Sequence, residues 1–193
     1  ITVDGEVDND ATIECLCNQA LALAKAGVDM VAPSDMMDGR VGAIRQYLDE
    51  ADLSRVNILA YSVKHASSLY YPFRDALGNK ASTDKKTYQM DYRNFKETLR
   101  EIELDILEGA DIVMVKPAIT SLDIIHAAAN QFTVPIFAYQ VSGEYAMIKS
   151  AAMAEYLLWD EAILESLISI KRAGARAIVS YAALDVAKRL AKI

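Results

Sequence analysis

Apolar and polar positions along the chain follow two patterns, one typical of buried strands and one typical of helices. Nearly continuous apolar runs occur at 28–32, 57–63, 111–115, 135–141 and 177–182. Runs of this length predict strands buried on both faces. Helical spacing of apolar positions is found at 10–26, 40–50, 93–108, 122–131, 144–157, 161–173 and 184–192. The pattern therefore predicts five strands, each followed by a helix.

Strands that alternate with helices pair in parallel, and two architectures have this order. One is an open doubly wound sheet, and the other is a barrel of eight βα units. No glycine-rich phosphate-binding motif follows any strand, which weakens the nucleotide-binding version of the open sheet. Polar residues follow the strands instead: Ser34 with Asp35, Lys64, Lys116, Ser142 with Glu144, and Tyr181. Parallel α/β proteins place their active sites at these strand ends.

Two of the predicted strands end in lysine, in NILAYSVK (Lys64) and in DIVMVKP (Lys116). An ion pair with a nearby carboxylate would explain one such lysine. Two lysines at the same edge of the predicted sheet instead favour a catalytic role. Burial disfavours the charged form of an amine, and a second ammonium nearby disfavours it further. Two adjacent lysines can hold two ketones as imines and present them to each other.

The segment from residue 64 to about residue 92 is polar and has no sustained period. Loops of such length in a compact domain are usually functional or disordered. Arg74, Lys85 and Gln89 lie in this segment, and its basic residues suit a lid that closes over carboxylates. A solvated charged loop explains the same residues equally well.

Charge and composition exclude several other functions. The net charge of −7, with scattered basic residues, argues against a nucleic-acid surface. The longest apolar runs are too short to cross a membrane. Cys15 and Cys17 lie two apart on a predicted helix and point in different directions, so we expect reduced thiols in a cytoplasmic protein.

Seven motifs, in order and closely spaced, resemble the porphobilinogen synthase (5-aminolevulinate dehydratase) family. They are VAPSDMMDGRVGAIR, YSVKHASSLYYPFRDA, DKKTYQM, GADIVMVKPA, LDII, YQVSGEYAMIK and LESLISIKRAGA. The resemblance implies a lyase of tetrapyrrole (haem) biosynthesis that condenses two 5-aminolevulinate molecules into porphobilinogen with loss of water. It also implies a TIM barrel and a large homo-oligomer, commonly an octamer.

The resemblance assigns roles to residues at matching positions. Lys116 matches the lysine that forms the Schiff base with the first substrate, and Lys64 matches the second Schiff-base lysine. The expected substrate-binding groups are Ser142, Tyr181 and Tyr139 for the first substrate, and Arg74, Lys85, Gln89 and Ser34 for the second. Glu101 matches a carboxylate of an allosteric magnesium site.

The chain also departs from the family pattern. The family usually has arginine in place of Lys85. Lysine keeps the positive charge but cannot make the two parallel hydrogen bonds that arginine makes to a carboxylate. Further departures are Tyr71, Thr120, Ser121 and Arg176. Family members are longer at the N-terminus, where the ligands of the active-site metal, Mg²⁺ or Zn²⁺, would lie.

We therefore expect a C-terminal portion of the family: a single incomplete barrel domain over residues 1–193 with about five βα units and a lid at 65–90. A class I aldolase is an alternative, although it needs only one catalytic lysine. A non-catalytic truncated homologue, acting as a structural or interaction module, is the alternative outside enzymes.

Overall fold

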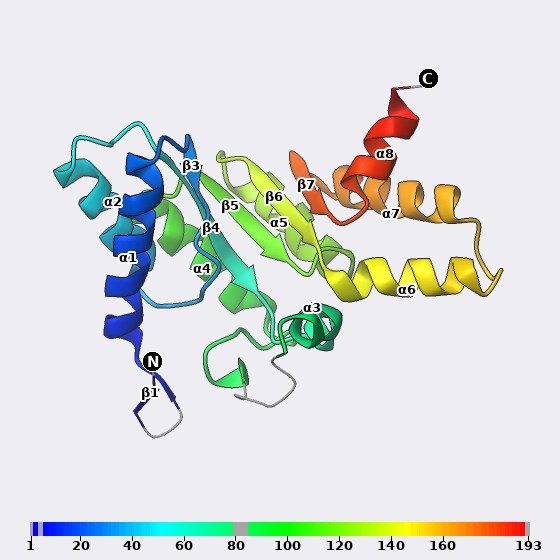
Figure 1. Ribbon diagram of the computed structural model, residues 1–193, viewed down its shortest axis with the longest axis horizontal. Helices are drawn as coiled ribbons and strands as arrows, with labels where there is room; N and C mark the ends of the chain where they lie inside the picture. The colour runs from blue at the N-terminus through cyan, green and yellow to red at the C-terminus, as the bar shows by residue number, and fades with distance from the viewer. Residues whose placement is uncertain (1, 4–5, 79–84, 192–193) are drawn as a thin grey trace. The chain divides into compact units, whose positions relative to one another are not determined.

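The computed structural model describes residues 2–3, 6–78 and 85–191, and helices alternate with strands along most of this length (Figure 1). The helices are α1 (Asn9–Lys25), α2 (Arg40–Glu50), α3 (Tyr71–Ala76), α4 (Phe95–Leu107), α5 (Leu122–Gln131), α6 (Ser142–Met153), α7 (Trp159–Ala173) and α8 (Ala183–Leu190). The strands of the main sheet are β3 (Met30–Val31), β4 (Asn57–Lys64), β5 (Ile112–Lys116), β6 (Ile136–Gln140) and β7 (Ala177–Ser180).

The five strands of this sheet follow one another in the order β3-β4-β5-β6-β7. The pair β3–β4 is parallel, with Met30 opposite Asn57, and so is the pair β6–β7, with Phe137 opposite Ala177. Parallel pairing requires a crossover between consecutive strands, and helices supply these crossovers. The prediction of an α/β fold with parallel strands is confirmed, whereas the number of βα units in a closed barrel stays a prediction.

Two parts of the chain differ from the predicted pattern. An antiparallel pair, β1 (Thr2–Val3) and β2 (Glu6–Val7), precedes α1 and was not predicted. The expectation of no regular structure after β4 was wrong, because this segment contains η1 (Ser68–Tyr70), α3 and η2 (Lys85–Thr87). These helices are too short to show a period, although Ser67 caps η1 by accepting a hydrogen bond from the amide of Leu69. Residues 79–84 of the expected lid lie outside the described residues.

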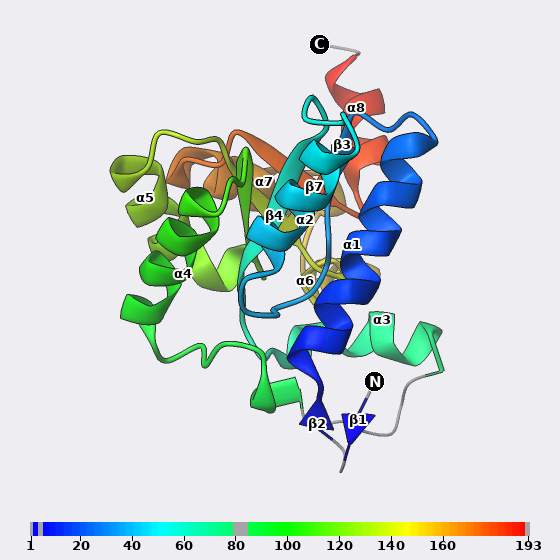
Figure 2. The same ribbon diagram turned by 90° about the vertical axis from the view of Figure 1, so that its left-hand side faces the viewer.

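The chain forms two compact units, and the first comprises the described parts of residues 1–66, 83–114 and 132–135. Helix α1 packs against α2 (Figure 2), and Asp8 caps α1 by accepting a hydrogen bond from the amide of Ala11. Apolar side chains of α2, β4, α4 and β5 form the buried core: Val41, Ile44, Leu48, Ile58, Val63, Ile102 and Val113. This core holds β4, and therefore Lys64, in place.

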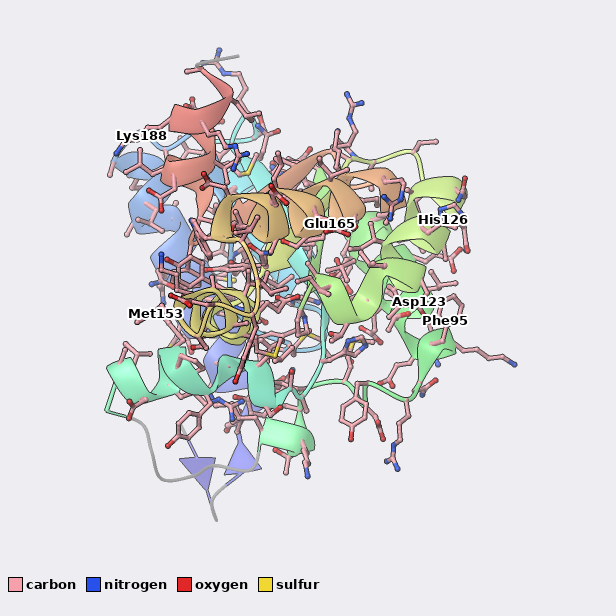
Figure 3. All side chains as sticks on the ribbon, turned by 90° about the vertical axis from the view of Figure 1, so that its right-hand side faces the viewer. Phe95, Asp123, His126, Met153, Glu165 and Lys188 are labelled. Atoms are coloured by element: carbon pink, nitrogen blue, oxygen red, sulfur yellow. The ribbon has the colours of Figure 1, made fainter. Side chains whose placement is uncertain are left out.

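The second unit comprises the described parts of residues 67–82, 115–131 and 136–193. In this unit, α5 packs against α7, and α3 packs against α6. Its core contains Ile124, Ile125, Ala128, Ile136, Ala138, Ile163 and Ile170. Met153, at the end of α6, is exposed, as is Lys188 on α8 (Figure 3). The prediction of a single domain over 1–193 stays a prediction.

None of the helices in the described ranges combines the length and the apolar character needed to cross a membrane.

Candidate active site

Lys116 is the last residue of β5, and it lines a small pocket in the second unit. The residues around this pocket are Tyr70, Phe73, Lys116, Tyr139, Val141, Ser142 and Tyr181. Three residues that the resemblance assigns to the first substrate, Ser142, Tyr181 and Tyr139, thus meet at the predicted nucleophile. One ammonium and several hydroxyl groups at a strand end can bind a carboxylate and present an amine to a ketone.

Two tyrosine rings hold the side chain of Lys116. Its Nζ atom lies 4.4 Å from the ring centroid of Tyr139 and 5.1 Å from that of Tyr70. The ring of Tyr139 in turn lies 6.5 Å from that of Tyr181. An ammonium group near an aromatic face is attracted by the ring quadrupole. The rings therefore restrict where the amine can point.

Ser142 contacts the segment that follows β4. Its Oγ accepts a hydrogen bond from the amide of Phe73 at 3.2 Å and lies 3.4 Å from the carbonyl oxygen of Leu69, to which it donates. The predicted carboxylate-binding hydroxyl is thus engaged with the polypeptide backbone. The cavity volume beside it is about 30 Å³, which is room for about one water molecule. A substrate therefore requires this segment or its side chains to move.

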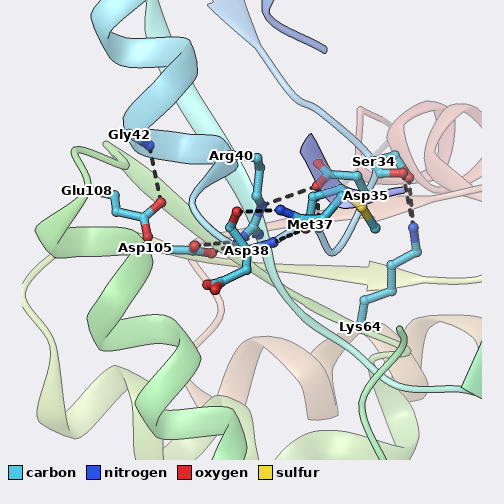
Figure 4. A network of polar contacts seen from close by, with 10 residues as sticks. Ser34, Asp35, Met37, Asp38, Arg40, Gly42, Lys64, Asp105 and Glu108 are labelled. Carbon is cyan, nitrogen blue, oxygen red and sulfur yellow. Dashed lines mark hydrogen bonds and ion pairs between the residues drawn. The ribbon is translucent and has the colours of Figure 1, made fainter. Parts of the chain in front are cut away.

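Lys64 is the last residue of β4 and is buried in the first unit. Its Nζ donates to the carbonyl oxygen of Ser34 at 3.1 Å and to Ser34 Oγ at 3.4 Å (Figure 4). The structure therefore brings together these two residues, which the resemblance assigns to the second substrate. The ring of Tyr61 lies 5.9 Å from the same Nζ atom.

A buried ionic network lies beside Lys64 (Figure 4). Arg40, the first residue of α2, makes two hydrogen bonds to the carboxylate of Asp105 on α4, at 2.6 and 2.9 Å. Its Nε lies 3.4 Å from Asp35 Oδ1. Burial raises the pKa of Asp35, and the charges of Arg40 and Lys64, with a hydrogen bond from the amide of Met37, oppose this. The network fixes the loop that carries Ser34.

The three expected lid residues do not all lie in one unit. Arg74 belongs to α3, and its guanidinium carbon lies 5.6 Å from the ring centroid of Tyr70 in the second unit. Lys85 and Gln89 lie in the first unit, where the amide of Gln89 donates to the carbonyl of Lys85 at 2.8 Å. Gln89 lines one cavity of about 270 Å³ and another of about 530 Å³. These are larger than the cavity at Lys116.

Glu101 lines the larger of those two cavities with Asp38, Glu97 and Arg100. Burial raises the pKa of Glu101, and Asp105, Asp38 and Glu97 add to the effect, while Arg40 opposes it. Across residues 2–3, 6–78 and 85–191, no group of three or more His, Cys, Asp or Glu side chains is arranged to hold a metal.

Sequence reasoning assigned no role to three groups that shape these pockets: Tyr70, Arg40 and Glu144. From the sequence, Asp35 and Glu144 are identified only as polar residues that follow predicted strands. Of these three residues, only Arg40 has a sequence signal. It lies at the start of a predicted amphipathic helix, and an arginine that is buried there needs a charged partner. Tyr70 and Glu144 carry no such signal, because a tyrosine in a polar segment and a glutamate in the first turn of a helix are common and do not indicate contacts with the end of β5.

The family model described as "Delta-aminolevulinic acid dehydratase" matches residues 1–189. A protein of that name from Bradyrhizobium diazoefficiens is 54% identical over 192 residues, which cover 98% of this chain and 54% of the relative. One from Methanothermobacter thermautotrophicus is 54% identical over 187 residues, or 96% of this chain and 57% of the relative. The chain spans about half the length of these relatives.

A solved structure gives the same result. The crystal structure of delta-aminolevulinic acid dehydratase (porphobilinogen synthase) from Toxoplasma gondii, in complex with the reaction product porphobilinogen, superposes with a TM-score of 0.92. The sequence identity is 52%, and the match covers 95% of this chain and 53% of that chain.

Proposed function

Because the chain belongs to the delta-aminolevulinic acid dehydratase family, we propose that the whole protein condenses two molecules of 5-aminolevulinate into porphobilinogen with loss of water. The names of the relatives and the bound product in the Toxoplasma gondii structure support this reaction. The TM-score of 0.92 over about half of that chain supports the proposal that the five strands belong to a TIM barrel.

The placement of Lys116 is the observation that carries the proposal. Its amine lies between two aromatic rings in a pocket that also contains Ser142 and Tyr181. A deprotonated lysine amine attacks the ketone of 5-aminolevulinate, and the carbinolamine loses water to give an imine. Before this attack, the hydroxyls of Ser142 and Tyr181 bind the substrate carboxylate and orient the ketone toward the amine.

Lys64 is proposed to form the second imine. Its side chain is buried, and its contacts with Ser34 orient the amine. Arg74, Lys85 and Gln89 are proposed to bind the carboxylate of the second substrate, since cationic and amide groups suit an anion. Lys85 offers a point charge in place of a bidentate fork. Glu101 as a magnesium ligand, octameric assembly and cytoplasmic location stay predictions.

Reductive trapping tests the proposal directly. Incubation of the chain with 5-aminolevulinate and borohydride reduces each imine to a stable secondary amine, which intact mass and peptide mapping detect. We expect adducts at Lys116 and Lys64, and we expect Lys116→Met and Lys64→Met each to lose its own adduct. Lys188→Met, at an exposed position of α8, is the matched control and should keep both.

A folded chain that forms no adduct at either lysine would contradict the proposal. That outcome would favour the non-catalytic homologue. An adduct at one lysine only would favour the aldolase alternative, which needs a single nucleophile.

A further inference from the structure

Glu144 is a buried carboxylate for which the proposed reaction provides no role. It lies in the first turn of α6, and the structure gives it no solvent exposure. Its two oxygens accept hydrogen bonds from three backbone amides: Ile119 and Val141, both at 2.5 Å, and Ala118 at 3.4 Å. Hydrogen bonds to an ionised acceptor are stronger than neutral ones, and several of them offset the desolvation of a buried charge.

The three amides come from two different strand ends. Ala118 and Ile119 follow β5 and are two and three residues beyond Lys116, whereas Val141 follows β6 and precedes Ser142. One carboxylate thus connects the end of the strand that carries the nucleophile to the end of the strand that carries Tyr139.

The same helical turn also receives the segment after β4. Ser142 Oγ is hydrogen-bonded to the amide of Phe73 and the carbonyl of Leu69. Gly143 has no side chain, and a Cβ at its position would lie 2.4 Å from the carbonyl oxygen of Leu69. Of these three consecutive residues, Ser142 lines the pocket at Lys116, while Gly143 and Glu144 contact the backbone segments next to it.

The charge of Glu144 also acts on this pocket. Burial raises the pKa of Glu144, and the hydrogen bonds from Ile119, Val141 and Ala118 oppose that rise. Burial also raises the pKa of Tyr70, and the charge of Glu144 contributes to this effect while Arg74 opposes it. The hydroxyl of Tyr70 donates to the carbonyl oxygen of Lys116 at 3.2 Å.

From this geometry, and on the basis of the proposed function, we propose that Glu144 is a positioning residue for imine formation at Lys116. Its carboxylate holds the backbone after β5 against the start of α6, so that the amine of Lys116 stays between Tyr70 and Tyr139 and faces Ser142. Glu144 acts in this role through the backbone amides that it binds.

The test compares adduct formation at the two lysines in one reaction. In Glu144→Gln, the side-chain amide group meets backbone amides that are themselves donors, so at least one of the three hydrogen bonds is lost. Misplacement of a reacting group by about 1 Å can lower a rate up to 100-fold, so we expect the borohydride-trapped adduct at Lys116 to form roughly 10- to 100-fold more slowly. The adduct at Lys64, which lies in the other unit, serves as the internal reference and should be unchanged.

Glu161→Gln is the matched control, because it makes the same chemical change at an exposed position of α7 and should leave both rates unchanged. If Glu144→Gln does not fold, Glu144→Asp provides the same test, since its carboxylate keeps the charge but is one methylene too short to reach all three amides. An unchanged ratio of the two adducts in a folded Glu144 variant would overturn the positioning role. Absence of the Lys116 adduct in the unsubstituted chain would instead overturn the proposed function, and this inference with it.

Discussion

At the scale of single residues, Tyr70 shows how a buried side chain can serve two purposes at one lysine. Its ring lies 5.1 Å from Nζ of Lys116, and its hydroxyl donates to the carbonyl oxygen of the same residue. The hydroxyl and the ring can be separated by mutation. The hydroxyl contributes a hydrogen bond to the backbone, whereas the ring contributes the cation–π contact.

Tyr70→Phe is therefore expected to lower the free energy of unfolding by about 0.5–1.5 kcal/mol, the usual net contribution of one hydrogen bond. The ring remains, so trapping of the imine at Lys116 should persist. Urea unfolding and peptide mapping measure the two effects, and Tyr71→Phe, at an exposed neighbouring position, is the control. Loss of the Lys116 adduct without a loss of stability would contradict the assignment of a purely structural role to the hydroxyl. It would indicate that the hydroxyl takes part in imine formation.

At the scale of elements, two helical glycines have opposite surroundings. Gly143 in α6 packs against the backbone of Leu69, and an added Cβ would meet the Leu69 carbonyl oxygen, Cα and carbonyl carbon at 2.4, 2.6 and 2.8 Å. Gly42 in α2 meets nothing closer than a side-chain carbon of Glu108, at 3.6 Å. Backbone cannot yield as a flexible side chain can, so only Gly143 is required by a close approach.

The two alanine substitutions should consequently change stability in opposite directions. Gly143→Ala is expected to lower the free energy of unfolding by about 1–3 kcal/mol through overpacking. It should also speed hydrogen exchange at the amide of Phe73, which Ser142 holds. Gly42→Ala should raise the free energy of unfolding by about 0.5–1 kcal/mol, because alanine is the better helix former. Equal effects of the two changes would argue against close packing of Leu69 on α6.

At the scale of the whole molecule, the net charge is −7, and some acidic side chains lie close together. Glu101 is an example, because its partial burial is combined with the charges of Asp105 and Glu97 on α4 and of Asp38 before α2, while Arg40 opposes them. Its pKa is raised above the ordinary value of 4.5. The folded state therefore binds its proton more tightly than the unfolded state does, and this contribution to stability is complete below the ordinary value. It is lost as the pH rises through the raised pKa.

We therefore expect the free energy of unfolding of the chain, relative to that of Glu101→Gln, to fall as the pH rises from about 4 to 7. Urea titrations at a series of pH values, with a chelator present to exclude divalent cations, measure this difference. Glu103→Gln, on the exposed side of α4, is the matched control. A relative stability that rose with pH would show that Glu101 is stabilised as a carboxylate in the folded state.

Much of the fold follows from the sequence alone. Continuous apolar runs predicted the positions of all five strands of the sheet. Helical spacing predicted α5 with the same bounds that the structure shows. These features depend on neighbours a few positions apart, so the order of residues encodes them directly. The short helices after β4 and the pair β1–β2 were missed, because these segments contain neither a long continuous apolar run nor a full helical period.

The residues with candidate chemistry were likewise visible in the sequence, since Lys64 and Lys116 each end an apolar run. What surrounds them was decided by tertiary structure. Tyr70 reaches the carbonyl of a residue 46 positions away, and Glu144 binds amides 25 and 26 positions away. No local period records such pairs, because they form only when the packing of whole elements brings a buried donor to a buried acceptor. The sequence by itself determined where the amines lie along the chain, and only the packed structure decided what holds them in place.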